Sequence, residues 1–252
     1  MKTKIILLGA GGRMGKAIYE ATLSRDDCEI VAGVDIRAQE CTLPFPVYPK
    51  INDVAVKADV IIDFSHHSAV IEALDYAKKN RLAAVIATTG HNEDEVAYIE
   101  QSANEIPVFY SRNMSIGINL TIALAKKAAS ILGNSFDIEI IEEHHSKKLD
   151  APSGTALMIA DAIKDTLGKD TEYVYDRHMS RKERSKNEIG IHSVRGGSIV
   201  GEHEVVFAGK DEVIRIHHSA FSREVFAKGA ISAALYIAKK EKGFYNMEDM
   251  LN

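Results

Sequence analysis

The sequence has little of what marks an extracellular, membrane or nucleic-acid-binding protein. Its 252 residues include only two cysteines, Cys28 and Cys41, too few for a disulfide framework and without metal-ligand spacing. The apolar run 5–8 is too short for a signal peptide or a membrane span. The 31 Lys and Arg against 36 Asp and Glu give a net charge of −5, which argues against broad binding to nucleic acid. We expect a cytoplasmic enzyme or binding protein without a membrane or nucleic-acid partner.

What the chain does contain is typical of a globular protein. Its 46% hydrophobic and 27% charged residues exclude collagen-like and disordered chains, and its length allows one large domain or two small ones. Six of the ten histidines form doublets, His66-His67, His144-His145 and His217-His218. A doublet arises by chance on a polar surface or marks a site, so its context has to decide.

The first part of the chain has the pattern of a parallel α/β domain. Strands are predicted at residues 4–8, 29–35, 59–64, 83–87 and 107–110, and helices at 15–23 and 69–79. Continuous Val and Ile runs separated by helices indicate a parallel sheet covered on both faces. This is the doubly wound Rossmann-type fold of the α/β class.

After residue 113 the pattern changes. Helices are predicted at residues 118–132 and 154–167, and strands at 137–141, 173–175, 189–194, 204–208 and 213–217. Gly209-Lys210-Asp211 joins the last two strands as a hairpin. These elements indicate a smaller α+β domain with a mostly antiparallel or mixed sheet. We expect the final helix, residues 223–240, to pack back on the first domain.

A glycine-rich loop at residues 9–15 lies between the first predicted strand and helix. Glycine allows a tight turn close to a pyrophosphate, whose charge the helix N-terminus attracts. The loop departs from G-x-G-x-x-G because Met14 holds the sixth position, but it fits G-x-x-G-x-x-G. Asp35 ends the second strand, where an acid bonds the ribose hydroxyls of a dinucleotide. The alternative is a structural turn with an unrelated aspartate.

The sequence leaves the choice between NADH and NADPH as cofactor undecided. Asp35 favours NADH, whereas Arg13 or Arg37 could pair with the 2′-phosphate of NADPH. We expect dual use with a preference for NADH. The strand-end loops 63–67 and 87–90 can face the nicotinamide, or they can simply begin capped helices.

The most informative segment is Glu142–Ala156, which we expect to leave a strand, cross a polar loop and enter a helix. His and Lys can donate protons, and a helix N-terminus offers N–H groups to a carboxylate. The segment therefore suits a small anionic substrate that needs protonation. Its Glu-Glu-His-His run could hold a metal, but successive strand residues point to opposite faces, so we expect no metal site.

This segment resembles the signature E-x-H-H-x-x-K-x-D-A-P-S-G-T-A of the dihydrodipicolinate reductase family, now called 4-hydroxy-tetrahydrodipicolinate reductase, of bacterial lysine biosynthesis. The match has no gap, and the resemblance covers essentially the whole chain. It includes residues 9–15, 63–65, 88–90, 113–119 and 194–203. The chain departs from the family pattern at Ala87, at Met114 and in the loop after Asp176, which affects the expected cofactor preference and loop behaviour.

The resemblance implies NAD(P)H-dependent reduction of 4-hydroxy-tetrahydrodipicolinate or dihydrodipicolinate to tetrahydrodipicolinate, in diaminopimelate and lysine biosynthesis. It implies that hydride comes from nicotinamide C4, with His144 as proton donor and Lys148 as its cationic partner. The implied contacts to the substrate carboxylate are His145, Lys148, Ser153, Gly154 and Thr155.

The resemblance also implies a homotetramer of two-domain chains. Residues 1–114 and 223–252 would form a discontinuous dinucleotide-binding domain, and residues 115–222 a substrate-binding and tetramerisation domain. Hinges are expected at 112–115 and 219–223. The expected cofactor contacts are Gly9, Gly12, Arg13, Met14, Gly15, Asp35, Arg37, Phe64, Thr88, Thr89, Gly90, Asn113 and Met114.

Two other functions compete with this interpretation. A semialdehyde dehydrogenase needs a cysteine nucleophile in its second domain, and both cysteines lie in the first. A nucleotide-sensing binding protein without turnover has no evident need for a proton donor beside an anion pocket. The basic stretch 177–186 is interpreted as a solvated loop, or as a lid over an anionic ligand. We assign His66-His67 to the cofactor rim and His217-His218 to a structural or interface role.

Overall fold

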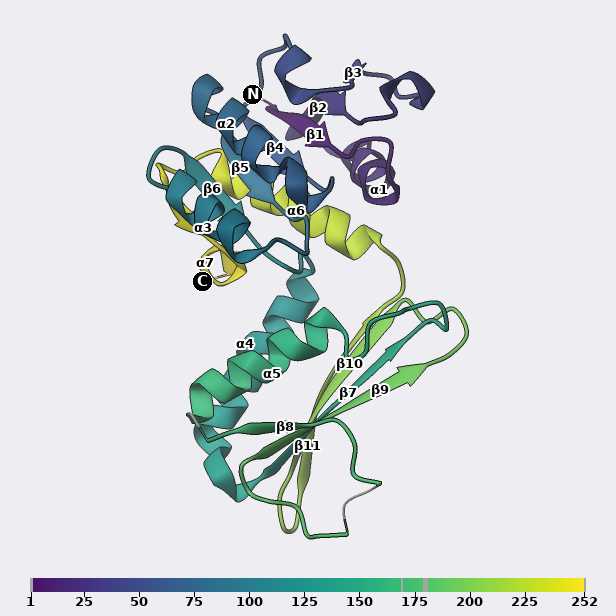
Figure 1. Cartoon of the computed structure of the whole chain (residues 1–252), viewed down its shortest axis with the longest axis vertical. Coiled ribbons are helices and arrows are strands. Elements are labelled where there is room, and N and C mark those ends of the chain that lie inside the picture. Colours follow the sequence, from purple (N-terminus) through teal and green to yellow (C-terminus); the bar gives the residue numbers. More distant parts are fainter. Residues whose placement is uncertain (1, 169, 179–180, 252) are drawn as a thin grey trace. The chain divides into compact units, whose positions relative to one another are not determined.

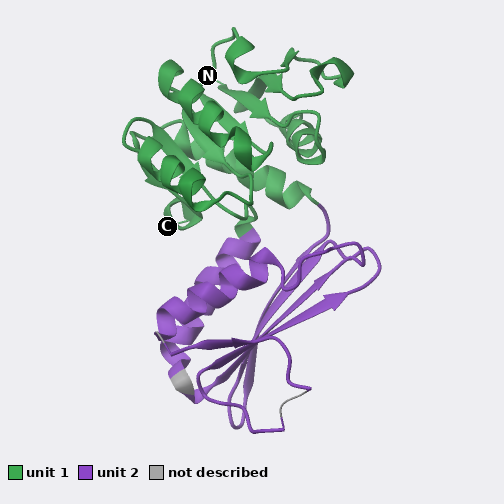
Figure 2. Cartoon of the chain, in the orientation of Figure 1, with its two compact units in different colours: residues 1–116, 223–252 green, residues 117–222 purple. Residues whose placement is uncertain are grey.

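The computed structural model describes residues 2–168, 170–178 and 181–251, without the side chain of Asn134. It divides into two compact units (Figure 2). The first comprises residues 1–116 and 223–252, and the second residues 117–222. The second unit is therefore inserted into the chain of the first.

A seven-stranded sheet forms the centre of the first unit (Figure 1). Its strands are β1 (Thr3–Leu8), β2 (Cys28–Val34), β3 (Val47–Tyr48), β4 (Val60–Asp63), β5 (Ala83–Ile86), β6 (Pro107–Tyr110) and β12 (Gly243–Tyr245). They follow the order β12-β6-β5-β4-β1-β2-β3, and every neighbouring pair is parallel. All side chains of β4 and β5 are buried, because both faces of the sheet are covered. The doubly wound Rossmann-type fold is thus confirmed.

Helices cover the two faces of this sheet. They are α1 (Arg13–Thr22), α2 (Val70–Asn80), α3 (Glu93–Ser102), α6 (Glu224–Ile237) and α7 (Met247–Leu251), with the 3₁₀ turns η1 (Ala38–Glu40), η2 (Ile51–Asp53) and η3 (His67–Ala69). Ile5 and Leu7 of β1 pack in one apolar cluster with α1 and α6, and Ile6 and Leu8 pack in the other with α2 and α3. The alternation of a single strand thereby supplies both cores.

Helix α3 is absent from the sequence prediction, although a local signal for it exists. Asn92 accepts a hydrogen bond from the Glu95 N–H, and the Glu95 side chain accepts one from the Asn92 N–H. This reciprocal capping box begins the helix. The Asn-x-x-Glu spacing was therefore the missed signal.

The second unit is a mixed sheet with two helices. Its strands are β7 (Asp137–His144), β8 (Glu172–Val174), β9 (Glu188–Arg195), β10 (Gly201–Ala208) and β11 (Val213–Ala220), and its helices are α4 (Ile116–Leu132), which begins in the first unit, and α5 (Gly154–Leu167), with the turn η4 (Gly133–Ser135). The strand order is β11-β10-β7-β9-β8. β8 and β9 run parallel to each other and β9 runs parallel to β7, whereas β10 is antiparallel to both of its neighbours. The predicted mixed sheet is confirmed.

Strand β7 is longer than the sequence analysis expected. The polar loop predicted after Ile141 begins only after His144, because Glu143 pairs with Glu202 of β10 and His144 pairs with Arg195 of β9. Along β7 the side chains alternate between half-buried and buried. Ile138 and Ile140 belong to the cluster that also contains residues of α4 and α5. By the period of two, Glu142 and His144 lie on this covered face.

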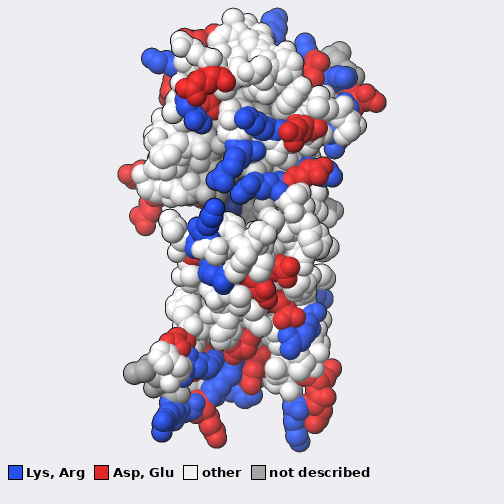
Figure 3. All heavy atoms as spheres, turned by 90° about the vertical axis from the view of Figure 1, so that its right-hand side faces the viewer, with Lys and Arg blue, Asp and Glu red and all other residues white. Residues whose placement is uncertain are grey.

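The basic stretch 177–186 forms more ion pairs with neighbouring strands than a solvated loop would. Arg177 donates to Glu188 at 2.6 Å, and Arg184 donates to Glu139 at 3.0 Å and to Asp137 at 3.1 Å. Figure 3 shows both basic and acidic side chains at the lower end of the second unit. Positions 179 and 180 lie outside the described residues.

Within the described part of the chain, no helix is long and apolar enough to span a membrane.

Candidate active site

The glycine-rich loop between β1 and α1 is shaped by positions that tolerate no side chain. Gly9 has φ +77°, and a Cβ there would lie 2.4 Å from the carbonyl oxygen of Phe64. A Cβ on Gly15 would lie 2.3 Å from the carbonyl oxygen of Gly9. The loop therefore runs close to its neighbours and opens directly into α1.

The N-terminus of α1 suits a phosphate group. Its N-cap residue, Gly12, provides no side-chain cap, and the first turn contains no acidic residue. Nothing from these side chains offsets the partial positive charge of the helix end. The loop and helix end thus fit the pyrophosphate of a dinucleotide. Arg13 is exposed beside them, whereas Met14 packs against the apolar core.

Asp35 lies in a pocket of about 330 Å³ at the end of β2. Its Oδ2 accepts a hydrogen bond from the Gly11 N–H and its Oδ1 accepts one from the Arg37 N–H, both at 2.9 Å. These bonds fix the carboxylate and leave lone pairs for a ribose diol. Arg37 lines the same pocket, and so does Lys16, which the sequence analysis did not single out. Lys16 follows Arg13 by three positions on α1, and this spacing was the available signal.

The loops after β4 and β5 are joined through a buried carboxyl group. Asp63 is fully buried and accepts hydrogen bonds from the N–H and hydroxyl of Ser65 and from the hydroxyl of Thr88. Burial raises the pKa of Asp63, although these hydrogen bonds oppose the shift. The Thr88 hydroxyl thus joins the two loops, while Thr89 and Gly90 are exposed. The role of Asp63 was missed because its two partners lie in different loops.

The remaining residues predicted near the nicotinamide are mostly engaged in packing and turns. Asn113 is buried, and its Oδ1 accepts a hydrogen bond from the Ser115 N–H at 2.9 Å. Met114 is buried, and a Cβ on Gly229 of α6 would lie 1.7 Å from its carbonyl oxygen. Phe64 packs half-buried against the same core cluster. Their contacts to a cofactor remain predictions.

Two of the three histidine doublets show no arrangement for catalysis. The rings of His66 and His67 lie 4.3 Å apart, and His67 Nδ1 lies 2.9 Å from Glu95. On β11, His217 Nε2 lies 2.8 Å from the Ser219 hydroxyl.

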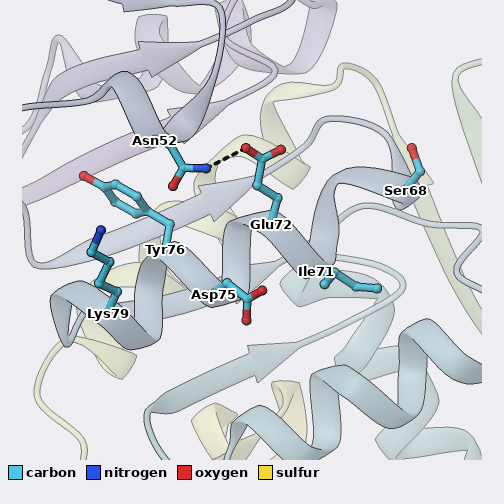
Figure 4. A pocket seen from close by; sticks show the side chains of 7 residues that line it. All are labelled: Asn52, Ser68, Ile71, Glu72, Asp75, Tyr76 and Lys79. Atoms are coloured by element: carbon cyan, nitrogen blue, oxygen red, sulfur yellow. Dashed lines mark hydrogen bonds between the residues drawn. The ribbon is translucent and has the colours of Figure 1, made fainter.

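Another hollow, of about 380 Å³, lies along α2 (Figure 4). Asn52 donates to Glu72 across it at 2.8 Å. It is lined by Asn52, Ser68, Ile71, Glu72, Asp75, Tyr76 and Lys79, none of which the sequence analysis assigned to a site.

The third doublet lies beside a buried charge cluster in the second unit. Glu142 is fully buried, and its Oε2 lies 2.5 Å from His144 Nδ1. Arg195 donates to both oxygens of Glu142, at 2.8 and 2.7 Å, and the Ser153 N–H donates to Oε1 at 3.1 Å. Both oxygens of the carboxylate therefore accept hydrogen bonds.

These contacts set the protonation of the cluster. Burial opposes ionisation of Glu142, but hydrogen bonds from Arg195, Ser193 and His144 outweigh it and lower its pKa to about 2. Burial lowers the pKa of His144, against the opposing charge of Glu142. Because Glu142 is ionised at neutral pH, it only accepts, so His144 Nδ1 carries the donated proton. His144 can then exchange a proton through Nε2.

The start of α5 adds an anion-binding group beside this cluster. Ser153 is the N-cap, and its hydroxyl accepts a hydrogen bond from the Ala156 N–H at 3.2 Å. Gly154 and Thr155 form the first turn, which contains no acidic residue. Its N–H groups can bind a carboxylate.

His203 of β10 borders the cluster. Its Nε2 lies 3.1 Å from the Ser153 hydroxyl, and its ring lies 5.2 Å from that of His144. Burial lowers its pKa to about 3, so His203 is neutral in the physiological range.

Lys148 and His145, two of the predicted substrate contacts, have different surroundings. Lys148 forms an ion pair with Asp150 at 2.9 Å, and the group in contact with His144 is Glu142. The charge of Lys148 is still close enough to lower the pKa of His144. His145 has a buried Nδ1 for which the described residues provide no hydrogen-bond partner.

His144 was predicted from the sequence, whereas its neighbours Glu142, Arg195 and His203 were not. The i, i+2 spacing of Glu142 and His144 was a usable signal once β7 is extended. Arg195 and His203 come from other strands, and only the strand pairing brings them close. Among the described residues, no group of three or more His, Cys, Asp or Glu side chains is placed to hold a metal ion.

Comparisons with known proteins identify the same reductase family along the whole chain. The family described as dihydrodipicolinate reductase, N-terminus, matches residues 3–114, and dihydrodipicolinate reductase, C-terminus, matches residues 117–251. The 4-hydroxy-tetrahydrodipicolinate reductase of Caldanaerobacter subterraneus subsp. tengcongensis is 50% identical over 100% of this chain and 99% of its own. That of Clostridium tetani is 47% identical over 100% and 98%.

A solved structure is similar over the same length. The dipicolinate-bound dihydrodipicolinate reductase from Paenisporosarcina sp. TG-14 has a TM-score of 0.78 at 25% identity, covering 98% of both chains. Sequence, fold and the arrangement around His144 lead to one assignment. The chain belongs to the dihydrodipicolinate reductase family.

Proposed function

We propose that this chain reduces 4-hydroxy-tetrahydrodipicolinate or dihydrodipicolinate to tetrahydrodipicolinate with NADH or NADPH, in diaminopimelate and lysine biosynthesis. The observation that carries the proposal is the buried Glu142–His144 pair beside the N-terminus of α5. Reduction of a cyclic dicarboxylate requires a proton donor next to an anion-binding group, and this arrangement supports the proposal. The 50% identity to a relative named for this activity supports it.

His144 is the proton donor in this proposal. The Nδ1–H is held by Glu142, so Nε2 carries the transferable proton when the ring is cationic. A positioned acid of this kind contributes about 10²–10⁴-fold to the rate. Lys148 stabilises the negative charge that develops on the substrate ring, and it binds a substrate carboxylate.

The dianionic substrate is held by groups of the second unit. The N–H groups of the first turn of α5 supply a partial positive charge without any side-chain reorganisation. The proposed contacts are His145, Lys148, Ser153, Gly154 and Thr155.

The first unit holds the dinucleotide, which when bound supplies the hydride from nicotinamide C4. The Gly9–Gly15 loop and α1 bind the pyrophosphate, and Asp35 accepts hydrogen bonds from the ribose hydroxyls. Arg13 or Arg37 pairs with the additional phosphate of NADPH. Because backbone N–H groups fix Asp35 in its pocket, we expect a preference for NADH.

We further propose a homotetramer assembled through the second unit, in the cytoplasm. Val194 of β9 and Val213 and Ile214 of β11 have exposed side chains, which supports contacts between copies through this sheet. Two cysteines without a disulfide suit a reducing compartment. Light scattering of the purified protein measures the oligomer, and a monomeric mass contradicts it.

Oxidation of NADH in the presence of freshly prepared dihydrodipicolinate tests the reaction. We expect turnover with NADH and, at lower efficiency, with NADPH. Binding of NADH without oxidation would instead favour a nucleotide-sensing protein.

A further inference from the structure

Both oxygens of the buried Glu142 carboxylate accept hydrogen bonds from two directions. His144 Nδ1 and one Arg195 nitrogen contact its Oε2, and the other Arg195 nitrogen and the Ser153 N–H contact its Oε1. Four donors thus fix both oxygens of a side chain that is fully buried. Such a carboxylate cannot rotate without breaking several charge-assisted hydrogen bonds.

We propose that Glu142, held by Arg195, is a positioning residue that fixes the tautomer of His144 and keeps its Nε2 as the proton-donating atom. This inference rests on the proposed role of His144 and adds how the acid is prepared. Glu142 and Arg195 act through His144. An ionised carboxylate on Nδ1 fixes the ring orientation and favours its cationic form.

Arg195 has a second function in this arrangement. Besides its two bonds to Glu142, it donates to the carbonyl oxygen of Asp150 at 2.7 Å. A planar guanidinium makes such bonds in fixed directions. Arg195 therefore joins the positioning carboxylate to the loop that carries Lys148.

Gly201 faces the Nε2 side of the His144 ring and has no side chain that would contact it. A Cβ on Gly201 would lie 3.2 Å from Nε2 of His144, tight enough to crowd the ring. His203 packs its ring edge-on against the ring of His144. The chain thus holds one nitrogen with a carboxylate and keeps space beside the other.

The charges that face His144 come from every element around it. Glu142 on β7 raises its pKa, whereas burial, Lys148 of the following loop and Arg195 of β9 lower it. His203 on β10 is neutral. Glu142 is thus the anion that raises the pKa of His144 against the effect of burial and of two cations. Without its charge, His144 loses its proton at a lower pH.

Glu142→Gln tests this dependence, with Glu139→Gln as the matched control. Glu139 lies on the same strand, and its Oε2 lies 2.7 Å from His192 Nε2. In Glu142→Gln the amide N–H₂ replaces an acceptor, so four donors can no longer be satisfied. The ¹⁵N shifts of His144, assigned with His144→Gln, report its tautomer and pKa in the full-length protein without substrate.

We expect the wild type to carry its neutral-state proton on Nδ1. In Glu142→Gln we expect mixed tautomers, a His144 pKa lower by about one unit, and a high-pH limb of kcat shifted equally, so that activity above that limb falls about tenfold. Glu139→Gln should show none of these changes. An unchanged tautomer and pH profile in Glu142→Gln overturns the inference.

Arg195→Lys tests the inference without removing the carboxylate, should Glu142→Gln not fold. The charge remains but the two-pronged bond is lost, so we expect mixed tautomers and a lower kcat with unchanged NADH affinity. An unchanged tautomer contradicts the inference. A wild type with the expected tautomer but no turnover would instead contradict the proposed function.

Discussion

His144 has to hold a proton in a site whose burial and neighbouring cations both favour its loss. The opposing charge comes from Glu142, two residues earlier on the same strand. In the proposed mechanism, catalysis depends on a few side chains, and replacing each of them has a different expected effect on turnover and binding.

Replacing the donor itself tests its role most directly. We expect His144→Gln to lower kcat by about 10²–10⁴-fold, because the amide cannot transfer a proton. NADH affinity should not change, since the cofactor groups lie on the first unit. Steady-state kinetics at saturating substrate measure the effect, with His192→Gln as the control. Turnover close to that of the wild type would contradict the assignment.

Lys148 is expected to act in binding as well as in turnover. Lys148→Ala removes a charged donor to a carboxylate, so we expect KM for the substrate to rise and kcat to fall, each about tenfold or more. Lys147→Ala, which removes the exposed neighbouring lysine, is the matched control. An unchanged KM in Lys148→Ala would remove Lys148 from the substrate contacts.

The local motif was enough to propose His144 and Lys148 as site residues, whereas the neighbours from other strands, Arg195 and His203, could not be predicted. Arg195 lies 53 positions from Glu142, and His203 lies 50 positions from Ser153. Strand register alone brings such residues together, and a one-residue slip would turn each to the opposite face.

At the scale of elements, the short loop from β1 to α1 shows how backbone shape determines a binding site. A side chain on Gly15 would collide with the carbonyl oxygen of Gly9, and a side chain on Gly9 would collide with the carbonyl oxygen of Phe64. The charge of the helix end is useful to a ligand only if the loop leaves that end accessible. Local geometry at these two positions therefore controls access to the proposed phosphate site.

We expect Gly15→Ala to weaken NADH binding about tenfold or more, because its Cβ would lie 2.3 Å from the Gly9 carbonyl oxygen and displace the loop. Fluorescence titration with NADH measures the affinity. Glu20→Ala, at an exposed position of α1, should bind normally. Equal affinity in both variants would show that the loop does not hold the pyrophosphate.

Long periodic elements were the predictable ones. The buried runs of β1, β4 and β5 and the helices α2, α4 and α5 were predicted to within a few residues at each end. The strands β3 and β12 have only two and three residues, too few for any period to be visible. The end of β7 was misplaced because its last residues are polar, yet Glu142 and Glu143 pair with both neighbouring strands and His144 pairs with β9.

At the scale of the whole molecule, the buried titratable groups determine the response to acid. Glu142 has a pKa lowered from 4.5 to about 2, and His203 has one lowered from 6.5 to about 3. In both cases the unfolded chain takes up protons at a higher pH than the folded protein. Their contribution to folding stability is therefore complete above about pH 6.5 and decreases as the pH falls.

Denaturant unfolding between pH 8 and pH 4 tests this dependence. We expect the free energy of unfolding to fall below about pH 6.5, where His203 protonates only in the unfolded state, and to fall more steeply below about pH 4.5. His203→Phe should reduce the loss between these two values. A wild-type stability that stays constant from pH 6.5 to pH 4.5 would contradict the buried neutral state of His203.

The insertion of the second unit into the first also affects the order in which the chain is completed during synthesis. Residues 117–222 leave the ribosome before α6 does, although α6 supplies Ala230, Ile231 and Ile237 to the core around β1. The strands β1 to β6 precede α6 in the chain, so the apolar side chains that pack against α6 stay uncovered until this helix emerges. The second unit can thus be finished while the first unit is still incomplete, a stage at which chaperones have an exposed surface to bind.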